Sequence, residues 1–214
     1  MGQARTGPVR RIESTLMESR PLRVDGAFAF TPPVYRDDRG FILAPFQETP
    51  FVGEVGYPLF PVVQTCFSKS RRGVVRGVHY TATPPGMAKY VYCAYGTIQD
   101  VVVDLRVGSP TYGAWDSVVL DQDSFQAVYL PVGVGHAFVS LADDSVMHYM
   151  LSAGYSTDTE LAISPLDLDL PLVIDANPVL SERDAAAPAF AAAERAGLLP
   201  HYDVCQEIEA KWRG

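Results

Sequence analysis

Residues 89–105 read KYVYCAYGTIQDVVVDL, which is two runs rich in Val, Tyr and Ile on either side of a single glycine, Gly96. Short runs of β-branched and aromatic residues that end at glycine or proline are typical of strands joined by tight turns. The same composition continues in both directions, from Arg23 to Leu151. It predicts an all-β body with strands near residues 26–31, 41–46, 62–69, 74–80, 89–95, 98–105, 115–120, 126–130, 137–141 and 146–152.

A body with this many strands has sheet edges and apolar faces to bury, and closure into a barrel or jelly roll buries both. We therefore predict a jelly-roll β-barrel with short N-terminal and C-terminal helices. The first helix is expected at residues 47–55. The second, rich in alanine, is expected at residues 182–196, where Ser181 and Asp184 provide its start and Gly197 its stop. Barrels hold ligands in their mouths, so functional side chains should point inward there.

One folded domain is expected, because 214 residues can bury a sizeable core but leave little room for a second large one. We expect this domain to span residues 22–202, after a disordered leader at 1–21 and before a C-terminal tail at 203–214. The longest apolar runs are far too short to cross a bilayer, and the leader lacks the apolar stretch of a secretory signal. No membrane partner is therefore expected.

The formal net charge of −8 argues against a nucleic-acid partner, because a protein that holds a polyanion needs a basic field to recruit it. A small anionic ligand is compatible with this charge if a few arginines gather locally. The cysteines, Cys66, Cys93 and Cys205, are odd in number and match no metal-binding spacing. They are interpreted as the reduced thiols of a cytoplasmic protein.

The strand around His79 is crowded with glycine and arginine, since residues 71–80 read RRGVVRGVHY. Several arginines in a short run usually mark a solvated face, but arginines beside glycines also suit a phosphate, which the guanidinium fork matches. Strict alternation would place Arg76 and His79 on opposite faces of the strand. Both reach one site only if the strand bends or bulges at Gly77. His148 and His201 are interpreted as structural.

His136 ends the sequence LPVGVGH, residues 130–136, which resembles the second cupin motif, Pro-x-Gly-x-x-His. Metal-binding cupins take their other ligands from a His-x-His pair followed by a Glu. Here the matching stretch has only His79, and Lys89 follows it, whose charge would repel a dication. We therefore predict a cupin-like barrel that has no metal and no other cofactor and works by acid–base chemistry.

Lys89 opens a predicted strand, and its ammonium should lie on the same side as Val91 and Cys93 because side chains alternate along a strand. A lysine in this position is ordinarily a gatekeeper at a sheet edge. Its functional interpretation is the stabilisation of negative charge that develops in a reaction.

With these residues placed, the chain from about Leu22 to Tyr202 resembles the dTDP-4-keto-6-deoxyhexose 3,5-, 3- and 5-epimerases, and within them the subgroup that makes antibiotic sugars. Each matching motif is weak alone, and their order and spacing make the set specific. The motifs are Asp38-Arg39-Gly40, Arg76-Gly77-Val78-His79, Ala88-Lys89-Tyr90, Asp100 with Asp104-Leu105-Arg106, Pro131-x-Gly-x-x-His136, Tyr149 followed by Gly154-Tyr155, and Ser181-Glu182-Arg183-Asp184.

The resemblance implies an isomerase that inverts C3, C5 or both in a cupin-type domain. It implies that His79 removes the proton next to the ketone, that Asp184 orients its imidazole, and that Tyr149 supplies a proton to the other face. Lys89 and His136 would hold the enolate oxygen or nearby hydroxyls. A tyrosine suits the donor role because its hydroxyl stays protonated at neutral pH.

The resemblance also implies the remaining contacts and the assembly. Asp100 would lie behind the residues that hold the oxygen, Tyr155 would line the sugar pocket, and Gln64 would touch the substrate. A homodimer is expected. The positions that match nucleotide and diphosphate contacts are Arg39, Arg76, Glu160 and Arg183.

Two positions depart from the family pattern. Ala44 stands where a glutamate is frequent, and Cys66 where an asparagine is frequent. Both changes remove polar groups from the expected pocket rim, which favours a substrate that lacks a hydroxyl or carries an unusual substituent.

Two alternatives remain open from the sequence. One is a ketoisomerase or dehydratase that acts on the same nucleotide sugars in a related barrel. The other is a cupin that binds a sugar nucleotide or a metal without catalysis. Proton carriers on two faces, His79 with Asp184 and Tyr149, favour an epimerase over a mere binder.

Overall fold

The structure is a computed structural model that describes residues 16–174 and 177–213. Its larger sheet is antiparallel and has the strand order β1-β2-β10-β7-β12-β5. These strands are β1 (Glu18–Pro21), β2 (Phe28–Thr31), β10 (Ala127–Leu130), β7 (Lys89–Tyr95), β12 (Ser145–Leu151) and β5 (Gln64–Ser70).

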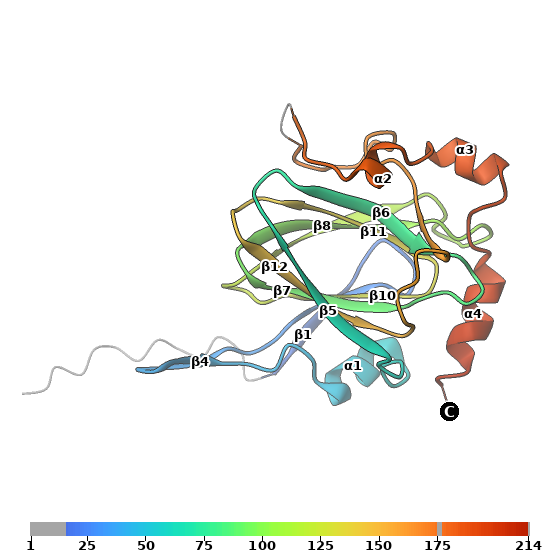
Figure 1. Cartoon of the computed structure of the whole chain (residues 1–214). Coiled ribbons are helices and arrows are strands. Elements are labelled where there is room, and N and C mark those ends of the chain that lie inside the picture. The colour runs from blue at the N-terminus through green and yellow to red at the C-terminus, as the bar shows by residue number, and fades with distance from the viewer. Residues whose placement is uncertain (1–15, 175–176, 214) are drawn as a thin grey trace, which may run out of the picture.

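The second sheet is also antiparallel and has the order β13-β6-β11-β8-β9. These strands are β13 (Glu160–Ala162), β6 (Val75–Thr81), β11 (Val134–Ser140), β8 (Thr97–Asp104) and β9 (Trp115–Asp121). The two sheets lie face to face and form the predicted cupin-like jelly roll (Figure 1).

The space between the sheets is filled by alternate residues of both. Val91, Cys93 and Met147 from the larger sheet meet Val102, Val118 and Phe138 from the smaller one in a single buried cluster. Figure 1 places helix α1 (Glu48–Val55) beneath the larger sheet, and α2 (Glu182–Ala185) and α3 (Phe190–Arg195) over the smaller one. Two further clusters lie on the outer faces of the sheets, where these helices cover them.

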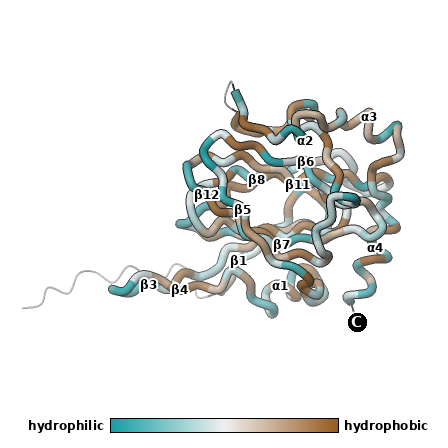
Figure 2. Tube along the Cα trace, viewed as in Figure 1, coloured by the Kyte–Doolittle hydropathy of each residue, from teal (hydrophilic) through white to brown (hydrophobic). Residues whose placement is uncertain are grey.

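A short hairpin, β3 (Tyr35–Asp37) paired with β4 (Gly40–Ile42), projects away from the barrel. Figure 2 shows that it carries a hydrophobic stretch although it stands clear of the body. Phe41 and Ile42 are 51% and 73% exposed. Apolar side chains at this exposure leave a hydrophobic surface of the hairpin open to solvent.

Every predicted strand overlaps a strand of the structure, and the helix expected at residues 47–55 is confirmed as α1. The single helix expected at 182–196 is wrong. Pro188 lies between α2 and α3, and a proline disfavours helical backbone in the residue before it and cannot donate a hydrogen bond itself. The cap at Ser181 is confirmed, since the Asp184 amide donates to its hydroxyl at 3.1 Å.

The expected disorder of the leader is wrong for residues 18–21, which form β1 and pair with β2. Met17 and Leu22 flank this strand and are each only 8% exposed, so burial at both ends holds it in place. Residues 1–15, on which the rest of that expectation rests, lie outside the described part of the chain.

The segment expected to be a tail also has structure. Residues 202–210 form helix α4 (Tyr202–Ala210), in which Cys205 and Glu209 are buried, with exposed fractions of 0% and 1%. The boundary at residue 202 stays a prediction. Within the described residues, none of the helices is both long and apolar enough to cross a bilayer.

An ion pair without exposed surface anchors the end of β8. Asp104 and Arg106 have side chains that are both 0% exposed. The guanidinium Nε and Nη2 each donate to the carboxylate at 2.8 Å, and Nη2 also donates to the Asp25 carbonyl at 2.8 Å. The Ser109 hydroxyl donates to the same carboxylate at 2.6 Å. The pair therefore joins β8 to the loop that precedes β2.

Candidate active site

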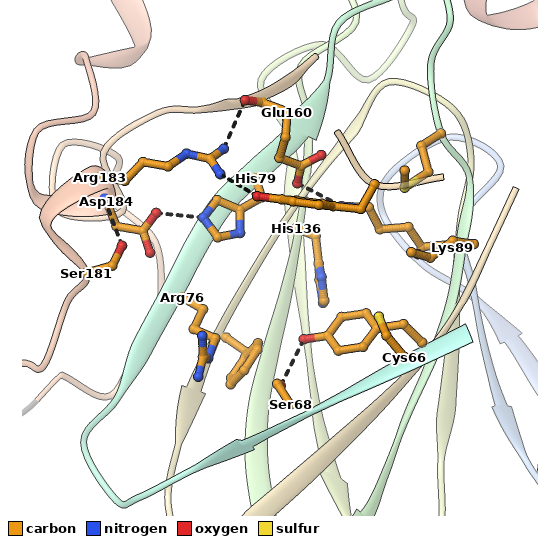
Figure 3. A pocket seen from close by; sticks show the side chains of 15 residues that line it. Cys66, Ser68, Arg76, His79, Lys89, His136, Glu160, Ser181, Arg183 and Asp184 are labelled. Atoms are coloured by element: carbon orange, nitrogen blue, oxygen red, sulfur yellow. Dashed lines mark hydrogen bonds and ion pairs between the residues drawn. The ribbon is translucent and has the colours of Figure 1, made fainter. Parts of the chain in front are cut away.

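A cavity of about 310 Å³ lies between the two sheets, and most of the predicted site residues line it. Figure 3 shows these side chains converging from β5 and β6 and from the α2 region. The lining residues are Cys66, Ser68, Arg76, His79, Met87, Lys89, His136, Phe138, Tyr149, Leu151, Tyr155, Glu160, Ser181, Arg183 and Asp184.

His79 and Asp184 form the predicted pair. His79 Nε2 lies 2.6 Å from Asp184 Oδ1, and the two side chains are 26% and 3% exposed. Burial opposes ionisation of Asp184, but the hydrogen bond and charge of His79 and the hydroxyl of Ser181 outweigh it, so the pKa of this carboxyl is lowered. An ionised carboxylate at this ring nitrogen fixes the orientation of the imidazole.

The predicted irregularity at Gly77 is confirmed. His136 pairs with His79 and Phe138 with Arg76, so β6 uses one residue more than β11 over the same interval. Gly77 has a φ of +112°, and a Cβ there would lie 2.4 Å from the His136 carbonyl oxygen. Only glycine fits this position, and the bulge turns both Arg76 and His79 into the cavity.

Tyr149 comes from the opposite sheet. It lies in β12 between Cys66 of β5 and Val91 of β7. Its hydroxyl is 3.4 Å from Ser68 Oγ, within hydrogen-bonding distance. Burial raises the pKa of Tyr149 well above its usual range, although the Ser68 hydrogen bond and the charge of Arg76 oppose this shift. The phenol is therefore protonated at neutral pH and faces the same cavity as His79.

Lys89 points into the cavity on the side of Val91 and Cys93, as predicted. Its ammonium lies 3.8 Å from the Glu160 carboxylate, and both side chains are 8% exposed. Glu160 also accepts a hydrogen bond from the Thr81 hydroxyl at 3.1 Å. In this structure Glu160 therefore contacts the lysine of the site, whereas the resemblance assigned it to the nucleotide.

His136 and Asp100 form a second imidazole–carboxylate pair, with 2.5 Å between Nε2 and Oδ1. Both are buried, at 5% and 0% exposure of the side chain. The His136 ring stands nearly perpendicular to the Tyr149 ring, with centroids 6.2 Å apart. Asp100 does not line the cavity and lies behind His136, which is the arrangement expected of it.

Three other predicted residues gather at the rim. Arg183 donates to the Tyr155 hydroxyl at 3.4 Å and to the Glu160 carbonyl at 3.0 Å. Gln64 does not line the cavity, but its side-chain oxygen accepts from the Tyr155 backbone amide at 2.8 Å. Gln64 thus holds Tyr155 in place in this structure.

Arg39 is not part of the chain's own cavity. It lies in the projecting hairpin, where it forms an ion pair with Asp37 at 2.5 Å and is 90% exposed. Of the two departures from the family pattern, Cys66 lines the cavity and Ala44 does not.

Sequence reasoning missed several lining residues. Ser68 carries no motif, and only its alternation with Cys66 along β5 could have placed it on the inner face. Met87, Phe138 and Leu151 were indistinguishable from core residues. Over the described ranges, no group of three His, Cys, Asp or Glu side chains is arranged to hold a metal ion.

The chain resembles known proteins over most of its length. The family model described as dTDP-4-dehydrorhamnose 3,5-epimerase matches residues 21–192. A dTDP-4-dehydro-6-deoxyglucose 3-epimerase from a Streptomyces species is 46% identical over 189 residues, which cover 87% of this chain and 96% of the relative.

Two solved structures support the same assignment. NovW, a 4-keto-6-deoxy sugar epimerase from the novobiocin gene cluster of Streptomyces spheroides, is 44% identical with a TM-score of 0.85, covering 94% of this chain and 100% of that one. ChmJ, a 3'-monoepimerase from Streptomyces bikiniensis solved with dTDP-quinovose, is 44% identical with a TM-score of 0.84, covering 90% and 98%. The chain therefore belongs to the dTDP-4-dehydrorhamnose 3,5-epimerase family and is an isomerase of the carbohydrate epimerase class.

Proposed function

We propose that this protein inverts C3, C5 or both in a dTDP-linked 4-keto-6-deoxy sugar. The observation that carries the proposal is the placement of His79 and Tyr149, which come from facing sheets and line one cavity. A base and an acid on opposite walls suit a reaction in which a proton leaves one face of a ring and another arrives on the opposite face.

The chemistry requires both carriers. The hydrogens on C3 and C5 flank the C4 ketone, so loss of either gives an enolate that shares its charge with the ketone oxygen. His79 takes the proton, and Asp184 stabilises the imidazolium that forms. A single base that returned its proton to the same face would regenerate the starting sugar, so Tyr149 donates from the other face.

Negative charge develops on the enolate oxygen during the reaction, and hydrogen-bond donors close to that oxygen stabilise it. Lys89 and His136 are the buried donors of the cavity suited to this role. Because they are held in place by Glu160 and Asp100, they need little reorganisation when charge develops. Arg76 and Arg183 are the guanidinium groups of the cavity and are suited to the diphosphate.

The comparisons favour an epimerase over the ketoisomerase and the non-catalytic cupin considered above. The relatives named for antibiotic-type sugars support a role in making a deoxysugar of an antibiotic or of rhamnose. Three cysteines that are odd in number and match no metal-binding spacing support a cytoplasmic location, and the net charge supports the absence of a nucleic-acid partner.

Solvent deuterium tests the proposed reaction. In D₂O with dTDP-4-keto-6-deoxyglucose, we expect deuterium at C3, C5 or both, accompanied by inversion at the labelled carbon. NMR identifies the position and the configuration, and so separates a 3-epimerase from a 3,5-epimerase. If deuterium enters at neither carbon and His79→Asn behaves like the unchanged protein, the proposal fails for this sugar.

We also propose that the protein is a homodimer in which Arg39 reaches the partner's cavity. The hairpin that carries Arg39 projects away from its own barrel and exposes apolar side chains.

Light scattering should give twice the mass of one chain. Arg39→Ala should raise KM about tenfold or more with little change in kcat, because a charge-assisted contact to the diphosphate is lost. Arg36→Ala in the same hairpin is the control, and a monomer with an unchanged KM contradicts the proposal.

A further inference from the structure

Each inversion leaves the protein in an altered protonation state. If His79 accepts a proton and Tyr149 donates one, the product leaves behind an imidazolium on one wall of the cavity and a phenolate on the other. Before the next inversion, the phenolate must recover a proton. This requirement follows from the proposed function and identifies a step that His79, Tyr149, Lys89 and His136 do not by themselves explain.

The surroundings of the Tyr149 hydroxyl offer one protein group for this step. Among the described residues, Ser68 Oγ is the one hydrogen-bond partner recorded for it, at 3.4 Å. The phenol is deeply buried, and the same burial that keeps it protonated makes its phenolate costly. The charge of Arg76 favours the phenolate, and the Arg76 side chain is itself held by a 3.2 Å hydrogen bond from Nε to the Ser70 hydroxyl.

Ser68 is placed to connect this buried oxygen with water. It lies in β5, which is the last strand of the larger sheet, and its side chain is half-buried while Ser70 at the end of the strand is buried. Ser68 also lines the cavity, on the side of Arg76 and away from Asp184 (Figure 3). A hydroxyl both donates and accepts, so it can pass a proton on without carrying a charge.

We propose that Ser68 is the hydroxyl through which Tyr149 recovers its proton after each inversion. The phenolate takes the Ser68 hydroxyl proton, and Ser68 takes a proton from a water molecule in the cavity. The hydroxide that remains accepts the proton that His79 removed from the sugar. Protons balance, and the protein returns to its starting state. Ser68 acts through Tyr149 and not on the sugar, so it is a positioning residue.

The test separates the first inversion from those that follow. In Ser68→Ala, Tyr149 starts protonated, so the first inversion should proceed within about threefold of the unchanged protein, while steady-state turnover should fall by about tenfold to a hundredfold, toward the lower range of general acid–base effects. Rapid quenching should then show a burst of one product per site. Ser68→Thr, which keeps the hydroxyl, should restore turnover, and Thr65→Ala on the outer face of the same strand should change neither rate.

Every other outcome contradicts either the proton relay from Ser68 to Tyr149 or the proposed epimerase activity. Equal loss of the first and later inversions in Ser68→Ala would make Ser68 a packing residue, and unchanged rates would assign proton return to another route. Either result overturns the relay and leaves the epimerase intact, because the unchanged protein still produces the epimer. Absence of epimer and of deuterium exchange in the unchanged protein would overturn both.

Discussion

Replacing His79 with asparagine should lower kcat/KM by about 10²- to 10⁴-fold, the usual range for loss of a positioned acid–base group. A carboxamide preserves a polar side chain but cannot take a proton from carbon. Deuterium exchange and inversion should fall together, because both need the proton to leave. The readouts are NMR of the sugar carbons and a thermal unfolding curve that shows the variant is folded.

A second histidine provides the matched control. His148 stacks on Tyr92 with ring centroids 5.3 Å apart and lies outside the cavity, so His148→Asn should retain activity. If His79→Asn were as active as His148→Asn, the base would have to be another group.

Tyr149→Phe should separate removal of the proton by the base from donation of a proton to the opposite face of the sugar. The base is still present, so it can remove a proton, exchange it with solvent and return deuterium to the same face. We therefore expect exchange at the sugar carbon without inversion. Parallel loss of exchange and inversion would show that Tyr149 does not act as the donor on the opposite face.

The sequence predicted the barrel well because its signal is local. Each strand carries its own run of β-branched and aromatic residues, and alternation alone placed Lys89 with Val91 on the inner face. The capping serine before Asp184 is equally local. One failure, the helix expected at 182–196, overlooked the local signal of Pro188. The others concern elements that tertiary contacts create. β1 forms because it pairs with β2, and β13 is three residues long and exists because it pairs with β6.

In the site, too, the residues placed by a local sequence signal were predicted and the contacts between distant segments were not. Glycine at position 77 signalled that Arg76 and His79 share a cavity, because only a bulge reconciles their spacing. In contrast, nothing in the sequence shows that Glu160 lies against Lys89 or that Ser68 lies against Tyr149. These pairs join strands far apart in the chain, and their partners follow from the register between strands, which motifs do not specify.

Replacing Arg106 with methionine should lower the free energy of unfolding by about 3–5 kcal/mol, because it leaves the Asp104 carboxylate buried without its counter-charge. Neither side chain has exposed surface, so solvent cannot compensate. Urea unfolding measures the change. Lys69→Met is the control, because Lys69 and Asp144 form an ion pair at 59% and 64% exposure and should contribute nothing measurable.

The double variant Arg106→Met with Asp104→Leu distinguishes an unpaired charge from lost packing. If the penalty comes from the unpaired charge, the double variant should be more stable than Arg106→Met alone. A double variant that is no more stable would assign the loss to the contacts of the guanidinium, including its hydrogen bond to Asp25.

The difference in the free energy of unfolding between the unchanged protein and Arg106→Met should change with pH in a definite direction. Burial opposes ionisation of Asp104, but Arg106, Ser109 and Thr111 outweigh it and lower the pKa of this carboxyl below its usual 3.8. A lowered pKa in the folded state adds stability that is fully present above 3.8 and is lost as the pH falls through the folded-state value. In Arg106→Met, burial acts on Asp104 without this counter-charge and raises the pKa of the carboxyl, so the advantage of the unchanged protein should shrink as the pH falls from that raised pKa towards the lowered pKa of the unchanged protein. An advantage that stayed constant into acid would mean that Arg106 stabilises the fold by packing and not by its charge.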